Sequence, residues 1–449
     1  MSAIRPPREL FEFARVLGDA GKACYLVGGA LRDYLLGREV SDFDVATDAR
    51  PEEIMRAYKR VVPTGIRHGT VTVLFEGLEI EVTTFRTESS YSDGRHPDRI
   101  EFASTIEEDL SRRDFTVNAM AFDLSSRTLL DPHGGRRDLG RRLVRAVGDP
   151  LERFSEDGLR PLRAIRIASQ LDFDIDAATL AAIRPSIGRF RAVSAERVRD
   201  ELQKILLSPV PSRGLRALET TGLLAEISSE LASCRGVEQR GMHVFDVLDH
   251  LYATVDAAAP ELVLRLAALL HDIGKPEAKV ERPGEPPTFH RHEEFSGRDA
   301  EAFMKRLRFP NAVAEEVAHL VRSHMFSYDE TWSDAAVRRF LARVGLGSLD
   351  RLFALRIADG TGIIGRPVDP RSLDALRDRI AGVLAAREAF GLSDLAIKGG
   401  DLASIGVPPG PKMGAMLKEL LETVIDDPEL NDRERLLEIG RRLKPKYGL

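Results

Sequence analysis

Hydrophobic and polar positions change their period near residue 150. Before that point, short runs alternate as strands do: ACYLVG (23–28), DFDVAT (42–47) and HGTVTVLFEGLEIEVTTF (68–85), the last with a turn at Glu76-Gly77. The segments GALRDYLLG and PEEIMRAYKR between them predict helices. The pattern therefore predicts that residues 1–145 form a small domain with a mixed sheet, here called the head.

Beyond residue 150, apolar residues recur at helical spacing, for example in RPLRAIRIASQL (160–171), ELVLRLAALLHDIG (261–274) and AAVRRFLARVG (335–345). The turn-rich stretches GRPVDP (365–370) and IGVPPGPKMG (405–414) interrupt this pattern. We expect an α+β protein in which the mixed-sheet head is followed by an all-α remainder. The predicted divisions are 1–145, 146–235, 236–365 and 366–449.

Composition describes a globular protein of 449 residues, 43% hydrophobic and 30% charged, with room for about three domains. Cys24 and Cys234 have no paired spacing, which favours a reducing compartment. No apolar run reaches the roughly 18 residues of a membrane span, and MSAIRPPRELFEF lacks a signal-peptide core. We expect a cytoplasmic protein. The net charge of −6 does not by itself suggest a nucleic-acid partner, although arginines crowd several helices.

Asp42 and Asp44 are the first candidates for chemistry. On a strand, residues two apart share a face, and two neighbouring carboxylates repel unless a divalent cation binds them. Oxygen ligands without cysteine or histidine favour Mg²⁺. Gly28-Gly29 at a strand-to-helix junction allows a phosphate to approach a helix N-terminus, with Arg32 one turn further on. Glu81 is a candidate third acid; a surface turn and an exposed strand carboxylate are the alternatives.

The series of motifs resembles the class II tRNA nucleotidyltransferases of the polymerase-β-type superfamily. The matching segments, in order, are LVGGALRDYLLG, DFDVAT, RRDFTVNAMAFD, DPHGGRRDLGRRLVRAVGDP, EDGLRPLRAIRIASQL and AERVRDELQKIL. The resemblance implies catalytic Mg²⁺ ligands at Asp42 and Asp44, with Glu81 as the third carboxylate. It implies nucleotide contacts at Gly28, Gly29, Arg32, Arg113, Asp114, Asn118, Asp157, Arg160, Arg163 and Arg166.

Base selection is assigned by this resemblance to Asp157 and Arg160. A carboxylate and a guanidinium side by side offer acceptors and donors that can imitate a Watson–Crick edge without a template. Positions 160, 163 and 166 lie nearly along one helix face. The alternative for this arginine row is a helix that lies over acidic neighbours.

Class II contains CCA-adding enzymes, enzymes that add only CC or only A, and bacterial poly(A) polymerases. VVPTGIRHGTVTV (61–73) is similar to the tRNA enzymes and lacks a basic segment typical of the poly(A) polymerases. A full-length flexible loop with Glu88, Tyr91, Asp93 and Arg95 supports the change from C to A addition, although any polar surface hairpin would look similar. We expect CCA addition to tRNA from CTP and ATP, with A-only addition as the alternative.

The second half resembles the HD phosphohydrolase superfamily through the order H…HD…H…H…D. The resemblance implies core metal ligands at His250, His271, Asp272 and Asp359, and a second metal or a phosphate near His292 and His324. Mixed imidazole and carboxylate ligands favour Mn²⁺, Ni²⁺ or Co²⁺. In this family such domains are associated with phosphatase and 2′,3′-cyclic phosphodiesterase activity.

Two alternatives concern the rest of the chain. The C-terminal region from IKGGDLASIG onward resembles the helical tail of the family, which is either a tRNA-backbone contact or a helical cap. An RNA-binding or regulatory protein built on an inactive head is the non-enzymatic alternative. Oligomeric state is not indicated.

Overall fold

The computed structural model describes residues 4–66, 69–89, 99–239, 241–283, 285–386 and 391–449. The chain divides into two compact units, Met1–Ser233 with Phe303–Phe309, and Cys234–Ala302 with Pro310–Leu449. The predicted divisions at residues 145, 235 and 365 stay predictions. None of the helices in the described ranges is long and apolar enough to cross a bilayer.

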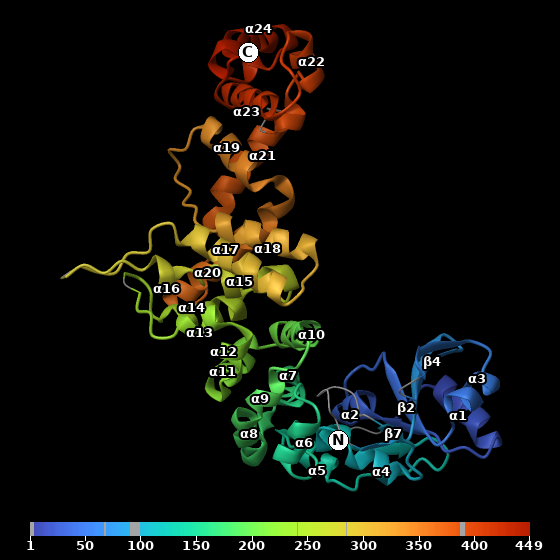
Figure 1. Cartoon of the computed structure of the whole chain (residues 1–449). Helices are drawn as coiled ribbons and strands as arrows, with labels where there is room; N and C mark the ends of the chain where they lie inside the picture. The colour runs from blue at the N-terminus through green and yellow to red at the C-terminus, as the bar shows by residue number, and fades with distance from the viewer. Residues whose placement is uncertain (1–3, 67–68, 90–98, 240, 284, 387–390) are drawn as a thin grey trace. The chain divides into compact units, whose positions relative to one another are not determined.

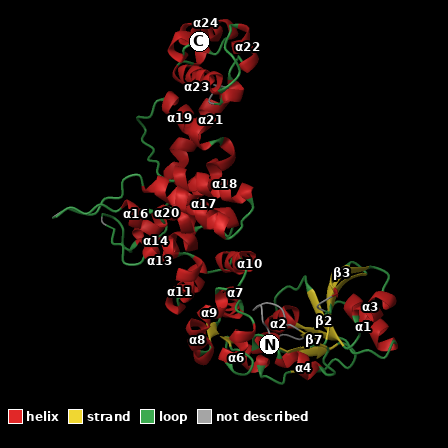
Figure 2. Cartoon of the chain, in the orientation of Figure 1, coloured by secondary structure: helices red, strands yellow, loops and turns green. Residues whose placement is uncertain are grey.

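A seven-stranded mixed sheet forms the centre of the head (Figures 1 and 2). Its order is β3-β4-β5-β2-β1-β8-β9; β2 and β5 are parallel, and the other neighbouring pairs are antiparallel. The strands are β1 (Tyr25–Val27), β2 (Phe43–Thr47), β3 (Val61–Gly65), β4 (Thr70–Phe75), β5 (Leu78–Thr84), β8 (Ala121–Asp123) and β9 (Leu129–Leu130).

In the described part of the head, the sheet is accompanied by the helices α1 (Arg8–Asp19), α2 (Gly28–Leu36), α3 (Pro51–Ala57), α4 (Ile106–Ser111) and α5 (Gly135–Gly140). The strand-to-helix junction predicted at the glycine pair is present, because β1 passes directly into α2. Gly28 has a φ of +68°, which a residue with a side chain adopts only at a cost. This junction brings the start of α2 to the ends of the central strands.

Two further strands, β6 (Thr87–Ser89) and β7 (Arg99–Glu101), pair antiparallel in a small separate sheet. They flank the predicted flexible loop. Tyr91, Asp93 and Arg95 lie outside the described residues, and Glu88 is described only as part of the backbone of β6. The expectation for this loop therefore stays a prediction.

Helices continue through the rest of the first unit. They are α6 (Pro150–Glu156), α7 (Arg160–Leu171), α8 (Ala177–Ile183), α9 (Ile187–Phe190), α10 (Ala195–Leu206), α11 (Pro211–Thr221), α12 (Leu223–Ile227) and α13 (Ser229–Ser233). The two-residue strands β10 (Leu143–Val144) and β11 (Asp174–Ile175) pair in parallel. The helical spacing of apolar residues beyond residue 150 predicts helices alone. The strand β11 departs from this prediction, because two residues are too few to show a period.

The second unit is helical. Its helices are α14 (Val247–Ala257), α15 (Leu262–Leu270), α16 (Lys275–Ala278), α17 (His292–Arg306, whose last turn falls in the first unit), α18 (Asn311–Ser323), α19 (Asp334–Val344), α20 (Leu346–Ile364), α21 (Asp374–Ala385), α22 (Gly399–Ser404), α23 (Pro411–Asp426) and α24 (Arg433–Leu443). α14 packs against α15 and α20, and α15 also packs against α18. The helices α22, α23 and α24 enclose a core of their own, which includes Leu402, Leu420 and Leu436. The predicted α+β class is confirmed.

Candidate functional site

Three acidic side chains lie on neighbouring strands of the head. Asp44 in β2 is the direct partner of Glu81 in the parallel strand β5, and Asp42 immediately precedes β2. Burial and the Glu81 and Asp42 carboxylates raise the pKa of Asp44 to about 6, against the opposite effects of Arg113 and Arg32. A divalent cation would remove this repulsion, so the three oxygen donors fit a hard ion such as Mg²⁺.

The start of α2 lies against the same carboxylates. A Cβ atom on Gly28 would come within 2.9 Å of Oδ2 of Asp44 and 3.5 Å of Nη1 of Arg113. The backbone therefore approaches the acidic group as closely as a glycine allows. Free N–H groups at a helix N-terminus bind phosphate, so a triphosphate can lie between this terminus and the carboxylates.

Arg32 and Arg113 provide positive charge here, and each is held in place. Nη1 of Arg32 donates a hydrogen bond to Oδ1 of Asn118 at 2.9 Å. Nε and Nη2 of Arg113 donate to Oδ2 of Asp109 at 3.3 and 3.1 Å. Asp109 is 1% exposed and also accepts from Arg112, so it orients both arginines. Asp109 was not predicted, although its position three and four residues before the arginines is a helical spacing that could have indicated it.

Asp114 is buried within this network. It accepts hydrogen bonds from the backbone N–H of Phe115 at 2.8 Å and from Nδ2 of Asn118 at 3.3 Å. Nη2 of Arg163 lies 2.8 Å from its Oδ2. Burial would raise the pKa of Asp114, but Arg163 and Arg160 hold it below the ordinary value. Its carboxylate therefore positions Asn118, and through Asn118 the guanidinium of Arg32.

The arginine row on α7 is paired with acidic groups. Arg160 donates to Glu156 and, at 2.8 Å, to the backbone carbonyl of Arg153. Arg163 pairs with Asp114 as above, and Nε of Arg166 lies 2.5 Å from Oε2 of Glu201. This packing is the arrangement named as the alternative, a helix over acidic neighbours. Because Arg163 and Arg166 are paired with acidic groups, their contacts with a nucleotide stay a prediction.

Asp157 lies just before α7 and pairs with a residue that sequence analysis missed. Nη1 and Nη2 of Arg197, from α10, donate to its two carboxylate oxygens at 3.1 and 2.7 Å. No side-chain hydrogen bond or ion pair joins Asp157 to Arg160 within the described ranges. Nη2 of Arg160 instead donates to the backbone carbonyl of Arg112 at 3.1 Å.

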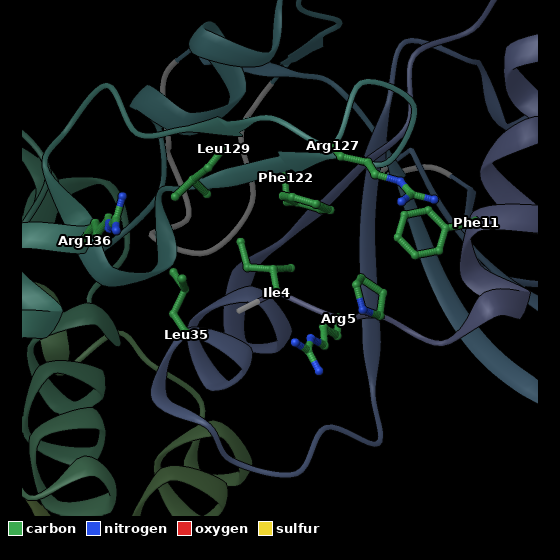
Figure 3. Close-up of a pocket in the computed structure, with 9 residues that line it drawn as sticks. Ile4, Arg5, Phe11, Leu35, Phe122, Arg127, Leu129 and Arg136 are labelled. Carbon is green, nitrogen blue, oxygen red and sulfur yellow. The ribbon is translucent and has the colours of Figure 1, made fainter. Parts of the chain in front are cut away.

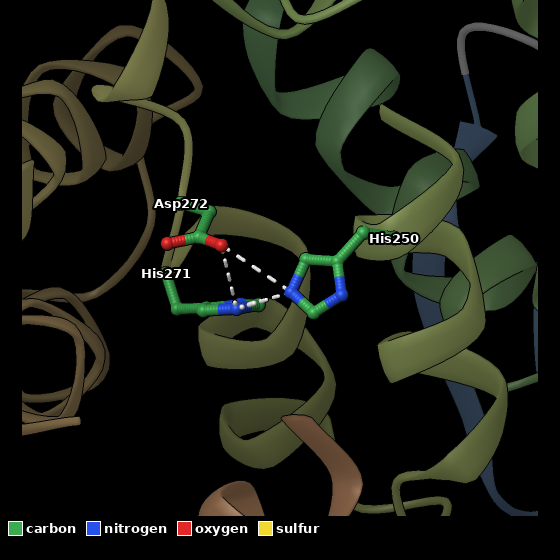
Figure 4. Close-up of side chains that lie close together, drawn as sticks. All are labelled: His250, His271 and Asp272. Carbon is green, nitrogen blue, oxygen red and sulfur yellow. Dashed lines mark hydrogen bonds and ion pairs between the residues drawn. The ribbon is translucent and has the colours of Figure 1, made fainter. Parts of the chain in front are cut away.

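The second unit brings together all six residues of the predicted HD site. They come from α14 (His250), the end of α15 (His271 and Asp272), the start of α17 (His292), the end of α18 (His324) and α20 (Asp359). Figure 4 shows His250, His271 and Asp272 converging. The two Nε2 atoms lie 3.0 Å apart, and each is 3.3 Å from Oδ2 of Asp272.

Asp359 completes this first group of ligand atoms. Its Oδ1 lies 3.3 Å from Nε2 of His250 and 3.5 Å from Nε2 of His271. Its other oxygen accepts from Nη1 of Arg356 at 2.7 Å, which orients the carboxylate. Two imidazole nitrogens and two carboxylate oxygens at these separations fit one transition-metal ion.

A second group forms around the other oxygen of Asp272. Nε2 of His292 lies 3.1 Å and Nε2 of His324 3.7 Å from Oδ1 of Asp272. Oδ1 of Asp272 and Nε2 of His292 are buried, and neither has a hydrogen-bond partner among the described atoms. Buried polar atoms are normally satisfied, so these two fit ligands of a second cation.

Three imidazoles are oriented in the same way. The Nδ1–H groups of His271, His292 and His324 donate to the carbonyl oxygens of Ala268, Phe289 and Val321, at 3.0, 2.8 and 2.6 Å. A carbonyl can only accept, so Nδ1 carries a proton and Nε2 faces the group, where a neutral ring can offer its lone pair to a cation. Lys275 lies at the edge of the cluster, its Nζ 2.6 Å from Oδ2 of Asp272. Neither Lys275 nor Arg356 was among the site residues predicted from the sequence.

A hollow of about 480 Å³ lies elsewhere in the head (Figure 3). Arg5, Arg127 and Arg136 surround it, and the guanidinium of Arg127 lies 4.8 Å from the ring centre of Phe11. None of the predicted site residues lines this hollow.

Comparison with known families agrees with the geometry of both sites. Residues 24–145 match the model of the Poly A polymerase head domain, and residues 218–361 match that of the HD domain. Residues 172–234 match an RNA- and SrmB-binding region of polymerase A, and residues 291–439 match a second tRNA nucleotidyltransferase domain.

Relatives that align over nearly the whole chain are CCA-adding enzymes. The CCA-adding enzyme of Levilactobacillus brevis is 34% identical over 435 residues, 96% of this chain and 97% of its own length. That of Lactobacillus johnsonii is 33% identical over 425 residues, 94% of each chain. The chain belongs to the CCA-adding enzyme family. The crystal structure of the Bacillus stearothermophilus CCA-adding enzyme in complex with CTP matches 99% of this chain and 100% of that chain, at 30% identity and a TM-score of 0.73.

The resemblance to class II tRNA nucleotidyltransferases with an HD domain is thereby confirmed. Nucleotidyltransferases of this class use a divalent metal, and the carboxylates of the head fit one. The roles of individual residues are taken up below.

Proposed function

We propose that the chain adds C, C and A in turn to the 3′ end of tRNA, from CTP and ATP and without a nucleic-acid template. The observation that carries this proposal is the pairing of Asp44 with Glu81 beside Asp42, directly under the N-terminus of α2. Family membership supports it, since the relatives aligned over nearly the full length are CCA-adding enzymes.

In this proposal Asp42, Asp44 and Glu81 hold Mg²⁺, which would neutralise triphosphate charge and favour ionisation of the tRNA 3′-hydroxyl. Gly28, Gly29 and the N–H groups at the start of α2 receive phosphate oxygens. Arg32 and Arg113 pair with the remaining phosphate charge, each held at a fixed orientation by Asn118 or Asp109. Such fixed donors contribute most when the transferring group gains charge.

Base selection belongs to Asp157 and Arg160 in this proposal. Asp157 is held bidentately by Arg197, which fixes the plane of the carboxylate. Arg160 would have to leave Glu156 to meet a nucleobase, so we expect its side chain to move when CTP or ATP binds.

The test uses tRNA that lacks its 3′ CCA, with labelled CTP and ATP. We expect stepwise addition of C, C and A, and loss of all incorporation in Asp42→Ala. Addition of A alone would identify an A-only enzyme, and long A tails would identify a poly(A) polymerase. No incorporation by the wild-type chain would overturn the proposal in favour of an RNA-binding protein.

We further propose that the six-residue cluster of the second unit is a phosphohydrolase site that takes Mn²⁺, Ni²⁺ or Co²⁺. It is supported by the converging ligand atoms and by the unpartnered Oδ1 of Asp272 and Nε2 of His292. With one water such a site could open a 2′,3′-cyclic phosphate at a damaged tRNA end to a monophosphate, and with a second water it could release inorganic phosphate. We expect metal-dependent opening of a 2′,3′-cyclic nucleotide, lost in His271→Ala/Asp272→Ala while CTP incorporation continues. A double variant that keeps the cyclic phosphodiesterase activity would contradict the assignment.

A cytoplasmic location is part of the proposal. Cys24 and Cys234 are both buried and free of disulfides, as suits a reducing compartment.

A further inference from the structure

A pocket of about 280 Å³ adjoins the metal-site cluster of the second unit. Two of its lining residues contact the cluster. Nζ of Lys275 lies 2.6 Å from Oδ2 of Asp272, and the ring of His243 packs edge to face on that of His250 with centres 5.4 Å apart. The lining residues are Gln239, Gly241, His243, Lys275, Pro286, Pro287 and Phe289.

Two polar atoms of this pocket have no protein partner. Nε2 of Gln239 and Nδ1 of His243 are buried and make no hydrogen bond among the described residues. The Gln239 amide is nevertheless oriented, because its Oε1 accepts from Nζ of Lys275 at 2.5 Å. A buried polar atom without a hydrogen bond destabilises the protein, and a hydrogen bond from a ligand would remove this penalty. Both residues that carry these atoms line the pocket, so a ligand bound there could supply the missing partners.

The remaining lining residues favour a ligand with a flat apolar group next to an anionic group. Lys275 is the charged side chain among the lining residues, while Pro286, Pro287 and Phe289 form an apolar wall. The ring centre of Phe289 lies 5.6 Å from Nζ of Lys275. A few convergent polar groups on an apolar surface are typical of small-molecule sites, and aromatic rings stack on nucleobases.

We propose that this pocket binds a nucleoside phosphate, with the phosphate at Lys275 and the base against Phe289. Gln239 and His243 bond to the ribose or to the base edge. The inference rests on the proposed phosphohydrolase function of the cluster and deepens it, because Gln239 and Phe289 then select a nucleoside end over a simple phosphate ester.

The test is isothermal titration calorimetry on the full-length, Mn²⁺-loaded chain, with adenosine 2′-monophosphate and with inorganic phosphate. Gln239→Leu and Phe289→Leu should each weaken nucleotide binding by roughly tenfold, the effect of one lost hydrogen bond or ring contact, and leave phosphate binding within about twofold. Glu238→Gln is the matched control, since Glu238 is an exposed neighbour that does not line the pocket. Metal content, measured in every variant, shows whether the cluster is intact.

Equal losses for both ligands, or nucleotide binding unchanged in both variants, would overturn the inference. A short RNA that ends in the same 2′-phosphate shows whether the nucleoside is free or a chain terminus. If nucleotide binding depends on Gln239 but no hydrolysis occurs, the proposed phosphohydrolase function is contradicted and the proposed nucleotide pocket is supported. If Gln239→Leu hydrolyses a 2′,3′-cyclic nucleotide with an unchanged KM, the phosphohydrolase function is retained and the proposed nucleoside pocket is contradicted.

Discussion

The carboxylate of Asp157 is held at both oxygens by the guanidinium group of Arg197, which comes from another helix. A bidentate pair of this kind fixes the plane of the carboxylate as well as its position. A residue that distinguishes nucleobases by hydrogen bonds needs such a fixed plane. A carboxylate that rotates could bond to the donor groups of several different bases. If Asp157 selects the base, as proposed above, Arg197 acts on base choice through Asp157.

We predict that Arg197→Met keeps nucleotide transfer and loses selectivity. Loss of charge-assisted hydrogen bonds worth about 1.5–3 kcal/mol would raise the relative kcat/KM for UTP against CTP by roughly ten- to a hundredfold. The measurement is single-nucleotide incorporation into tRNA lacking its 3′ end. Arg191→Met is the control, because Arg191 pairs with Glu226 and its side chain is 66% exposed. Equal selectivity in the two variants would show that Arg197 has no part in base choice.

At this scale the hydrogen-bond partners of the motif residues could not be predicted from the sequence. The motif around Asp157 and the arginines of α7 could be recognised in the sequence. The partners of Asp157 and Asp114 are 40 and 49 residues away, at Arg197 and Arg163. Every arginine in this part of the chain is chemically able to form such pairs. Only the packing of α7 and α10 selects among them.

At the scale of elements, helix ends orient the histidines of the second unit. His271 and His324 immediately follow α15 and α18, where the last carbonyl groups have no N–H partner within the helix. Each ring donates to the carbonyl three residues earlier, in Ala268 or Val321. The apolar periodicity predicted both helices. It could not predict which ring nitrogen would point into the site, because that depends on the rotamer at the helix end.

The junction between β1 and α2 gives a prediction at the same scale. In Gly28→Ala the left-handed backbone costs about 1–2 kcal/mol. The new methyl group would also lie 2.9 Å from Oδ2 of Asp44 and displace it. Displacement of a reacting group by about 1 Å can cost 10²-fold, so we expect kcat/KM for CTP to fall by roughly a hundredfold.

The control for this substitution is Gly18→Ala in α1. A Cβ atom there would meet no atom within 4 Å, and alanine is a better helix former than glycine in the last turn of α1. Gly18→Ala should therefore retain activity and unfold at an equal or higher temperature. Full activity of Gly28→Ala would show that α2 does not need its close approach to Asp44.

At the scale of the whole molecule, the two compact units should unfold as separate transitions. We predict that Ni²⁺, which prefers imidazole ligands, raises the midpoint of one transition in calorimetry. At a concentration 100 times the dissociation constant, the gain is about 2.7 kcal/mol. His250→Ala should abolish the shift, and His319→Ala, whose imidazole donates to the backbone of Val344, should retain it. A shift of both transitions, or a shift that persists in His250→Ala, would contradict the assignment.

The change of period near residue 150 predicted the head and the helical remainder, because side-chain periodicity is a local property. The inclusion of Phe303–Phe309 in the first unit was not predictable in this way. Residues 303–306 are the last turn of α17, whose earlier turns belong to the second unit, and residues 307–309 follow the helix. Periodicity shows that a helix forms, whereas the unit to which each turn belongs depends on contacts distant in sequence.

Asp272 offers Oδ2 to one group of ligand atoms and Oδ1 to the other. A cation bound at either oxygen withdraws electron density from the carboxylate and makes the opposite oxygen a poorer donor. If both positions bind cations, as proposed, their occupancies are thermodynamically linked through a single side chain. By reciprocity, each ion alters the dissociation constant of the other by the same factor, so a metal titration of this chain should depart from two independent binding curves.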